Sequence, residues 1–154
     1  MKKILIVFAA CLLPFAVNAQ AVAEESLRGL WKIIEYSDSE IQLDFAKDKV
    51  VTTERFAAMN PEFTKQQLEQ LGNDRLEYLK EDYLYFAPHS ILFEFSNDEE
   101  PSYYKYALSV RDGKQYLQLG ETTPNEIFIK DGLLYRINIV DGIGMKIVYK
   151  KKQE

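Results

Sequence analysis

The sequence feature that most constrains the fold is a repeated alternation of apolar and polar residues, interrupted by turn residues. Between Leu27 and Lys150, stretches rich in β-branched and aromatic side chains alternate with period two, the spacing of a strand that buries one face. Asp-Gly pairs, the preferred two-residue turns of β-hairpins, join the last four stretches. The pattern predicts an antiparallel meander. The pairs are Asp112-Gly113, Asp131-Gly132 and Asp141-Gly142.

The predicted strands number eight or nine. A sheet of that size, apolar on one face, leaves costly open edges unless it closes on itself. We therefore expect a mainly-β protein, an up-and-down antiparallel β-barrel of eight or nine strands. The alternative is a curved open sheet that cradles a helix, as in cystatin-like folds, but those usually begin with the helix. The expected strands span residues 29–36, 41–45, 50–56, 91–95, 104–110, 116–119, 127–129, 133–140 and 145–150.

A helical block is expected to interrupt the strands after the third one. The residues from Pro61 to Asp82 favour helix, and Thr64 can cap the first turn. Leucines in this block fall near one face, as in an amphipathic helix. Gly72-Asn73 is expected to divide the block into two shorter helices. We predict a lid or strap that packs on the sheet; a partner-binding helix is the alternative.

The first nineteen residues have the three parts of a secretory signal peptide. Two lysines precede an apolar run from Ile4 to Val17, and Val17-Asn18-Ala19 provides the small residues of a cleavage site. The run is about fourteen residues, shorter than the roughly twenty of a membrane-spanning helix. We therefore expect residues 1–19 to be removed and 20–154 to form one periplasmic or secreted domain. A retained anchor, or lipidation at Cys11, is the alternative.

Removal of this segment determines the composition of the mature chain. The 154 residues become 135, the size of one domain, and the only cysteine is lost, so no disulfide is expected. The 19 basic residues become 17 against 24 acidic ones, a net charge of −7. Such a surface repels phosphate backbones, so we expect no nucleic-acid partner. No integral membrane segment is expected after cleavage.

A short motif resembles the opening of the lipocalins and of the bacterial lipocalin-like domains. Gly29-Leu30-Trp31 lies on the first predicted strand and precedes the meander. The resemblance implies a calycin-type barrel with an internal cavity, in which Trp31 closes one end. It also implies that Arg136 lies across the indole as a structural clasp, a cation–π contact. An inserted helical block and the absence of disulfides fit the bacterial group better than the animal carriers.

Residues for catalysis or metal binding are sparse. His89 is the only histidine, and we expect it in a turn at the barrel mouth. Ser90 follows it directly, so the two side chains point to opposite faces of a strand. Glu94 lies in an apolar strand and is expected to face outward, opposite to Phe93 and Phe95. We therefore expect no enzyme activity, no catalytic residue, no metal site and no cofactor.

Two functions fit these expectations. The first is an extracytoplasmic protein that holds a small hydrophobic or amphipathic molecule in the barrel, with the helical block as a flap. The second is a non-enzymatic interaction or scaffold module whose interior is filled by side chains. A cavity of several hundred cubic ångströms would favour the first function. The residues expected to line that cavity are Phe93, Phe95, Tyr104, Tyr106 and Tyr135.

Overall fold

The computed structural model describes residues 22–97, 99–140 and 142–153. The predicted signal peptide, 1–19, lies outside these residues. Within them the chain forms three helices and ten strands. The helices are α1 (Glu24–Leu27), α2 (Glu54–Met59) and α3 (Lys65–Leu79). The strands are β1 (Gly29–Ser37), β2 (Ile41–Asp44), β3 (Lys49–Thr52), β4 (Tyr83–Ala87), β5 (Ile91–Phe95), β6 (Ser102–Arg111), β7 (Lys114–Leu119), β8 (Asn125–Lys130), β9 (Leu133–Val140) and β10 (Ile143–Lys151).

Eight of the strands form a closed antiparallel barrel, which confirms the expected closure, but β2 and β3, two of the nine strands expected in the barrel, lie outside it. From β4 to β10 each strand pairs with the next one in the chain, and β1 pairs with both β4 and β10 to complete the circle. Two strand predictions were wrong. β4 was not among the expected strands. The third strand was expected to reach Phe56 but ends at Thr52, because Phe56 belongs to α2.

The expected hairpin turns are present where the chain is described. Asp112 and Gly113 have φ angles of 52° and 74°, and Asp131 and Gly132 have angles of 53° and 75°. Positive φ at both central residues is the geometry that two-residue hairpins require, and glycine adopts it without steric cost. These turns therefore set the register of β6 with β7 and of β8 with β9.

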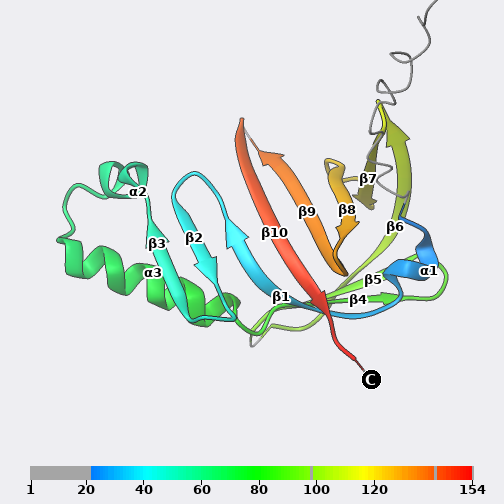
Figure 1. Ribbon diagram of the computed structural model, residues 1–154, viewed down its shortest axis with the longest axis horizontal. Coiled ribbons are helices and arrows are strands. Elements are labelled where there is room, and N and C mark those ends of the chain that lie inside the picture. Colours follow the sequence, from blue (N-terminus) through cyan, green and yellow to red (C-terminus); the bar gives the residue numbers. More distant parts are fainter. Residues whose placement is uncertain (1–21, 98, 141, 154) are drawn as a thin grey trace, which may run out of the picture.

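Strands β2 and β3 extend the sheet beside the barrel. The first part of β1, from Gly29 to Lys32, pairs with β4, whereas Glu35 to Ser37 pair with β2. The change of partner accompanies a bulge between Ile33 and Glu35. Figure 1 shows α2 and β3 on the far side of β2 from the barrel strands, and α3 running from that side toward β4. Helical structure begins at Glu54 and not at Pro61, so the inserted block is larger than predicted. The block lies beside the barrel and not over its opening.

The long helix of this insertion is continuous. It begins with a capping box, in which Thr64 and Gln67 satisfy each other's backbone amides. The predicted division at Gly72-Asn73 does not occur, and Gly72 instead packs closely against the sheet. A Cβ atom at Gly72 would lie 2.6 Å from Val50 Cγ1 and 3.4 Å from Ile41 Cδ1. No helix in the described residues is long and apolar enough to cross a lipid bilayer.

Helix α1 closes one end of the barrel. Leu27 and Val22 are buried, and the indole Nε1 of Trp31 donates a 2.6 Å hydrogen bond to the Leu27 carbonyl. The Gln115 side chain both accepts from the Val22 amide and donates to its carbonyl. His89 lies in the exposed turn between β4 and β5 at this end, with φ of 64°. Val22 and Leu27 thus contribute to the core at this end of the barrel.

Candidate functional site

The register of the barrel strands shows which side chains point inward. Directly opposed residues of antiparallel strands share a face of the sheet. Leu92 is fully buried and lies opposite Tyr104, so Tyr104 points into the barrel. Tyr106 also points inward, is 4% exposed, and packs its ring edge-on against Phe86. The structure therefore places Tyr104 and Tyr106 inside the barrel, as expected.

A charged pair spans the interior. Arg136 Nη1 on β9 lies 2.7 Å from Glu94 Oε1 on β5, and Arg136 Nε donates a 2.8 Å bond to Asn125 Oδ1. Strands β5 and β9 are not neighbours in the sheet, so this contact crosses the lumen. The expectation that Glu94 faces outward was wrong. Its inward orientation is stabilised because the guanidinium compensates its charge.

Two further polar side chains, Asp82 and Tyr149, lie beside this ion pair near the end of the barrel opposite α1. Burial, reinforced by the charges of Glu94 and Glu99, raises the pKa of Asp82 to about 6. One buried carboxylate oxygen of Asp82 has no hydrogen-bond partner. Burial raises the pKa of Tyr149 to about 12, although the charge of Arg136 opposes that rise.

These groups line a lumen pocket of about 170 Å³. Ligand sites for small molecules usually have volumes of about 300–1,000 Å³. Much of the remaining interior is filled, because large side chains from all eight barrel strands meet there. The buried ones include Trp31, Leu84, Phe86, Leu92, Tyr106, Leu117, Ile127, Leu134 and Tyr149.

The cation above the Trp31 ring is Lys151, not Arg136. Lys151 lies directly opposite Trp31 in the β1–β10 register, and its Nζ is 5.4 Å from the centre of the indole. Arg136 is instead engaged by Glu94 and Asn125. The partner named by the family resemblance was therefore wrong, although Trp31 is buried in the core. The signal for Lys151 was its position near the end of the last strand.

Phe93, Phe95 and Tyr135 lie on the outer surface of the barrel. Phe93 and Phe95 have the opposite parity to Leu92 and Glu94, and Phe93 contacts Tyr103 on β6 with ring centres 6.3 Å apart. Tyr135 stacks on Phe128 at 4.7 Å, also outside. The inward parity expected for these three residues was wrong. A role in ligand contact for any of the five predicted residues stays a prediction.

Two rows of outward side chains form a continuous surface that sequence reasoning did not identify. One row crosses β8, β9, β10, β1, β4 and β5, and the other begins beside the end of β10 and crosses β1, β4, β5 and β6. We call this surface the outer aromatic–lysine face. The first row contains Lys130, Leu133, Lys150, Lys32, Tyr83 and Phe95; the second contains Lys152, Leu30, Tyr85, Phe93 and Tyr103.

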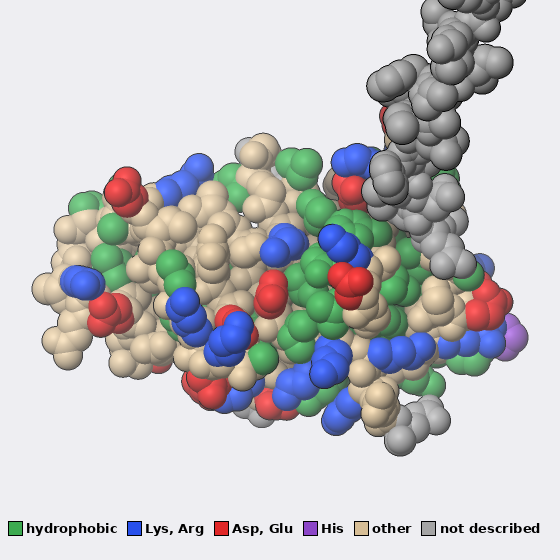
Figure 2. Space-filling view, in the orientation of Figure 1, with side chains coloured by type: hydrophobic (Ala, Val, Ile, Leu, Met, Phe, Trp, Pro, Cys, Tyr) green, Lys and Arg blue, Asp and Glu red, His purple; other side chains and the backbone are tan. Residues whose placement is uncertain are grey.

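Two lysines of this face lie over one of its aromatic rings. Lys32 Nζ and Lys152 Nζ are each 5.3 Å from the centre of the Tyr83 ring. Tyr103 is 74% exposed and Tyr85 is 39% exposed. Next to the face, a groove of about 860 Å³ is lined by Leu30, Tyr85, Leu133 and four basic side chains, with Asp131 as its one carboxylate. Figure 2 shows Lys and Arg side chains gathered near the C-terminal end of β10.

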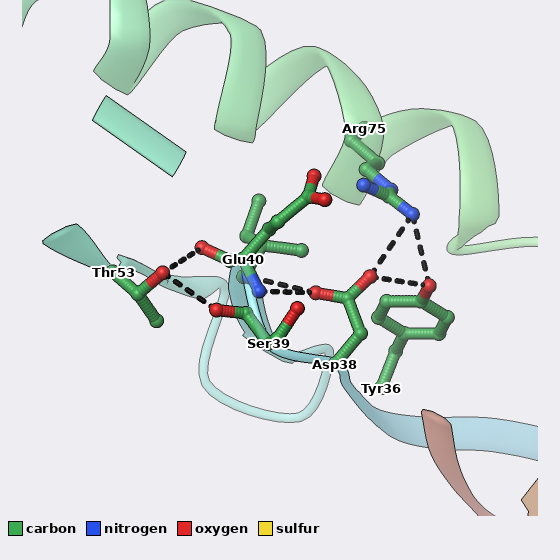
Figure 3. Close-up of polar contacts among 7 residues, drawn as sticks. Tyr36, Asp38, Ser39, Glu40, Thr53 and Arg75 are labelled. Atoms are coloured by element: carbon green, nitrogen blue, oxygen red, sulfur yellow. Dashed lines mark hydrogen bonds and ion pairs between the residues drawn. The ribbon is translucent and has the colours of Figure 1, made fainter. Parts of the chain in front are cut away.

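A polar cluster anchors the insertion to the sheet (Figure 3). Asp38 accepts hydrogen bonds from the amides of Glu40 and Ile41 and from the Tyr36 hydroxyl, and Arg75 of α3 reaches both Tyr36 and Asp38. Burial favours the neutral form of Asp38, but these donors and the Arg75 charge lower its pKa. Burial and the bond to Asp38 raise the pKa of Tyr36 to about 12. Tyr36, Asp38 and Arg75 each have a partner, which is the arrangement of a structural anchor, whereas the buried Ser39 hydroxyl beside them has none.

Among residues 22–97, 99–140 and 142–153, no three His, Cys, Asp or Glu side chains are grouped as a metal site requires. Comparisons with models of known protein families, with curated proteins and with solved structures find no match to this chain.

Proposed function

We propose that this protein is a non-enzymatic interaction module, exported from the cytoplasm, whose barrel interior serves as its core and whose outer aromatic–lysine face binds the partner. The observation that carries the proposal is the volume of the lumen pocket, about 170 Å³. A carrier of small molecules needs several hundred cubic ångströms, and buried side chains of the described residues fill much of the interior around this pocket. The outer face supports the second part of the proposal.

Exposed aromatic side chains distinguish this outer face from an ordinary barrel surface. Soluble proteins rarely expose contiguous apolar patches of more than a few hundred square ångströms, and larger ones mark interaction sites. Here Tyr85, Phe93 and Tyr103 form a row across three adjacent strands, with neighbouring ring centres 6.2 and 6.3 Å apart. The barrel core is complete without these rings. Core packing therefore does not account for their presence on the surface.

Native mass spectrometry of protein purified gently from the extracytoplasmic fraction tests this proposal. We expect the mass of the polypeptide alone, beginning at Gln20, and no saturable binding of a fluorescent fatty-acid analogue. Ile147→Trp, which fills the lumen pocket, is the diagnostic variant, and Tyr103→Ser is its control on the outer face. A one-to-one adduct that Ile147→Trp abolishes and Tyr103→Ser retains would show that the protein is a carrier.

A further inference from the structure

We propose, resting on the proposed function, that the outer aromatic–lysine face docks on an anionic lipid bilayer. The face combines four lysines with five aromatic rings and two leucines, and it contains no carboxylate. Tyrosines are enriched where proteins meet the membrane–water interface, and lysines bury their alkyl stems while the ammonium group stays near the headgroups. This composition matches a bilayer surface, in which charged headgroups lie above an apolar layer.

The charge of the face is opposite to that of the whole chain. The full chain has a net charge of −5, yet Lys32 on β1, Lys130 on β8, Lys150 on β10 and Lys152 just after β10 project from one surface. Glu81 lies 3.5 Å from Lys32, and Asp131 lines the groove beside Lys150 and Lys152. The field of the face therefore remains positive and orients the protein toward an anionic surface.

The side-chain types favour a bilayer over an anionic polymer. Nucleic acids and sulfated or uronic-acid glycans are recognised through planar arginine forks and amide groups that fix hydrogen-bond geometry. The two rows contain neither arginine nor Asn or Gln. Lysine is a point charge that suits a diffuse array of lipid phosphates. Leu30, Leu133 and the rings of Phe93 and Phe95 offer apolar surface that a polymer backbone would not cover.

The exposure of the side chains is also suited to a bilayer, at the part of the convex outer wall that a plane can touch. Tyr103 is 74% exposed at one end of the second row, and Lys152 is exposed at the other end. The aromatic side chains can therefore enter the headgroup layer while α2 and β3 stay away from it, on the far side of β2 (Figure 1).

Vesicle flotation tests this assignment with the mature protein. The probes are vesicles of phosphatidylglycerol mixed with phosphatidylcholine, and of phosphatidylcholine alone, at low and high salt. We expect binding to the anionic vesicles only, weakened by salt because screening shortens the reach of the charges. Each lysine near an anionic surface contributes about fivefold in partitioning, so Lys150→Gln with Lys152→Gln should weaken binding about 25-fold.

Matched variants separate the face from net charge. Lys49→Gln with Lys65→Gln removes the same charge from the insertion and should leave binding unchanged; Tyr103→Ser should weaken binding, whereas Tyr78→Ser on α3 should not. Melting curves confirm that each variant is folded. Equal losses in both lysine pairs, no flotation of the folded wild type, or lysine-dependent binding to heparin or oligothymidine without flotation would overturn the lipid assignment. None of those results would overturn the filled-barrel proposal. That proposal is tested separately by native mass spectrometry, where an adduct in the lumen would overturn it.

Discussion

Glu94 and Arg136 meet inside the barrel with their side chains 27% and 15% exposed. An ion pair with this little solvent contact is costly to break, because removal of one member leaves the other charge without compensation. Asn125, itself buried, occupies the Nε donor of Arg136. The pair is therefore part of the core of the barrel and not a surface contact.

A double-mutant cycle with Glu94→Gln and Arg136→Met tests this view. Arg136→Met alone should lower the free energy of unfolding by about 2–3 kcal/mol, since it strands the Glu94 charge. The double variant should cost less than the sum of the single changes by about 1–2 kcal/mol. Urea denaturation monitored by the fluorescence of Trp31 gives these values. A coupling energy below about 0.5 kcal/mol would instead indicate a solvated pair.

Asp82 makes stability depend on pH. Its pKa is about 6 in the folded protein against 3.8 ordinarily, so between these values the folded state holds more protons than the unfolded state. Stability therefore falls as the pH rises from 4 to 6, and the loss persists above pH 6.

Asp82→Asn should remove this loss. We expect the variant to be more stable than wild type at pH 7.5 by about 1 kcal/mol, a value reduced for the partial exposure of the carboxyl group. Near pH 4 the two proteins should melt together, because the wild-type carboxyl is then largely protonated in the folded state. Thermal unfolding across this pH range checks the sign. An equal difference at both pH values would assign the effect to packing.

At the scale of the elements, α3 is joined to the sheet by a close apolar contact and a polar anchor. Gly72 allows the helix to approach Val50, and Arg75 lies 5.0 Å from the centre of the Tyr36 ring while its guanidinium bonds the Tyr36 hydroxyl. Thr53 both caps α2 and donates to the carbonyls of Ser39 and Glu40. The helices thus depend on the β1–β2 loop for their position.

Gly72→Ala should destabilise the protein even though alanine favours helix by about 1 kcal/mol over glycine. The added Cβ would lie 2.6 Å from Val50 Cγ1, and overpacking of this kind costs about 1–3 kcal/mol. Denaturant unfolding should show a smaller loss when the same change is made in a Val50→Ala background. Asn73→Ala, on the exposed neighbouring position, is the control and should not destabilise. A stabilised Gly72→Ala protein would contradict the close contact.

At the scale of the whole molecule, the barrel and the insertion have different support. Strands β6 and β7 are each paired on both sides, whereas β3 is an edge strand that pairs only with β2. Helix α3 packs mainly on that edge strand. Elements with fewer buried contacts open at lower free energy than core strands.

Hydrogen exchange should reveal this difference. Amides of Lys65–Leu79 are expected to exchange faster than those of β6 and β7 under native conditions, because the helix can undock without opening the barrel. Mass spectrometry of peptic fragments measures both regions in one sample. Arg75→Gln should increase exchange in α3 and leave β6 unchanged. Equal protection of the helix and the barrel strands would show that they unfold as one unit.

Several features of the fold were predictable because they depend on local chemistry. Period-two alternation and Asp-Gly turns located nine of the ten strands, and the closed barrel follows from the number of strands. The start of α3 was readable from Thr64. The end of the third strand was not, because Phe56 satisfies a strand pattern as well as it satisfies the buried side of α2.

The sequence alone determined that strands with two distinct faces would close into a barrel, since alternation and turn residues act over a few neighbouring positions. It did not determine which face lies inside. Strand β5, Ile91–Phe95, is apolar on both faces, so the choice depended on partners distant in the chain. Only the tertiary structure brings Arg136 to Glu94 and Lys151 to Trp31. The buried charge of Glu94 requires a compensating group that the closed barrel places within reach, and the register of β1 with β10 places Lys151 opposite Trp31.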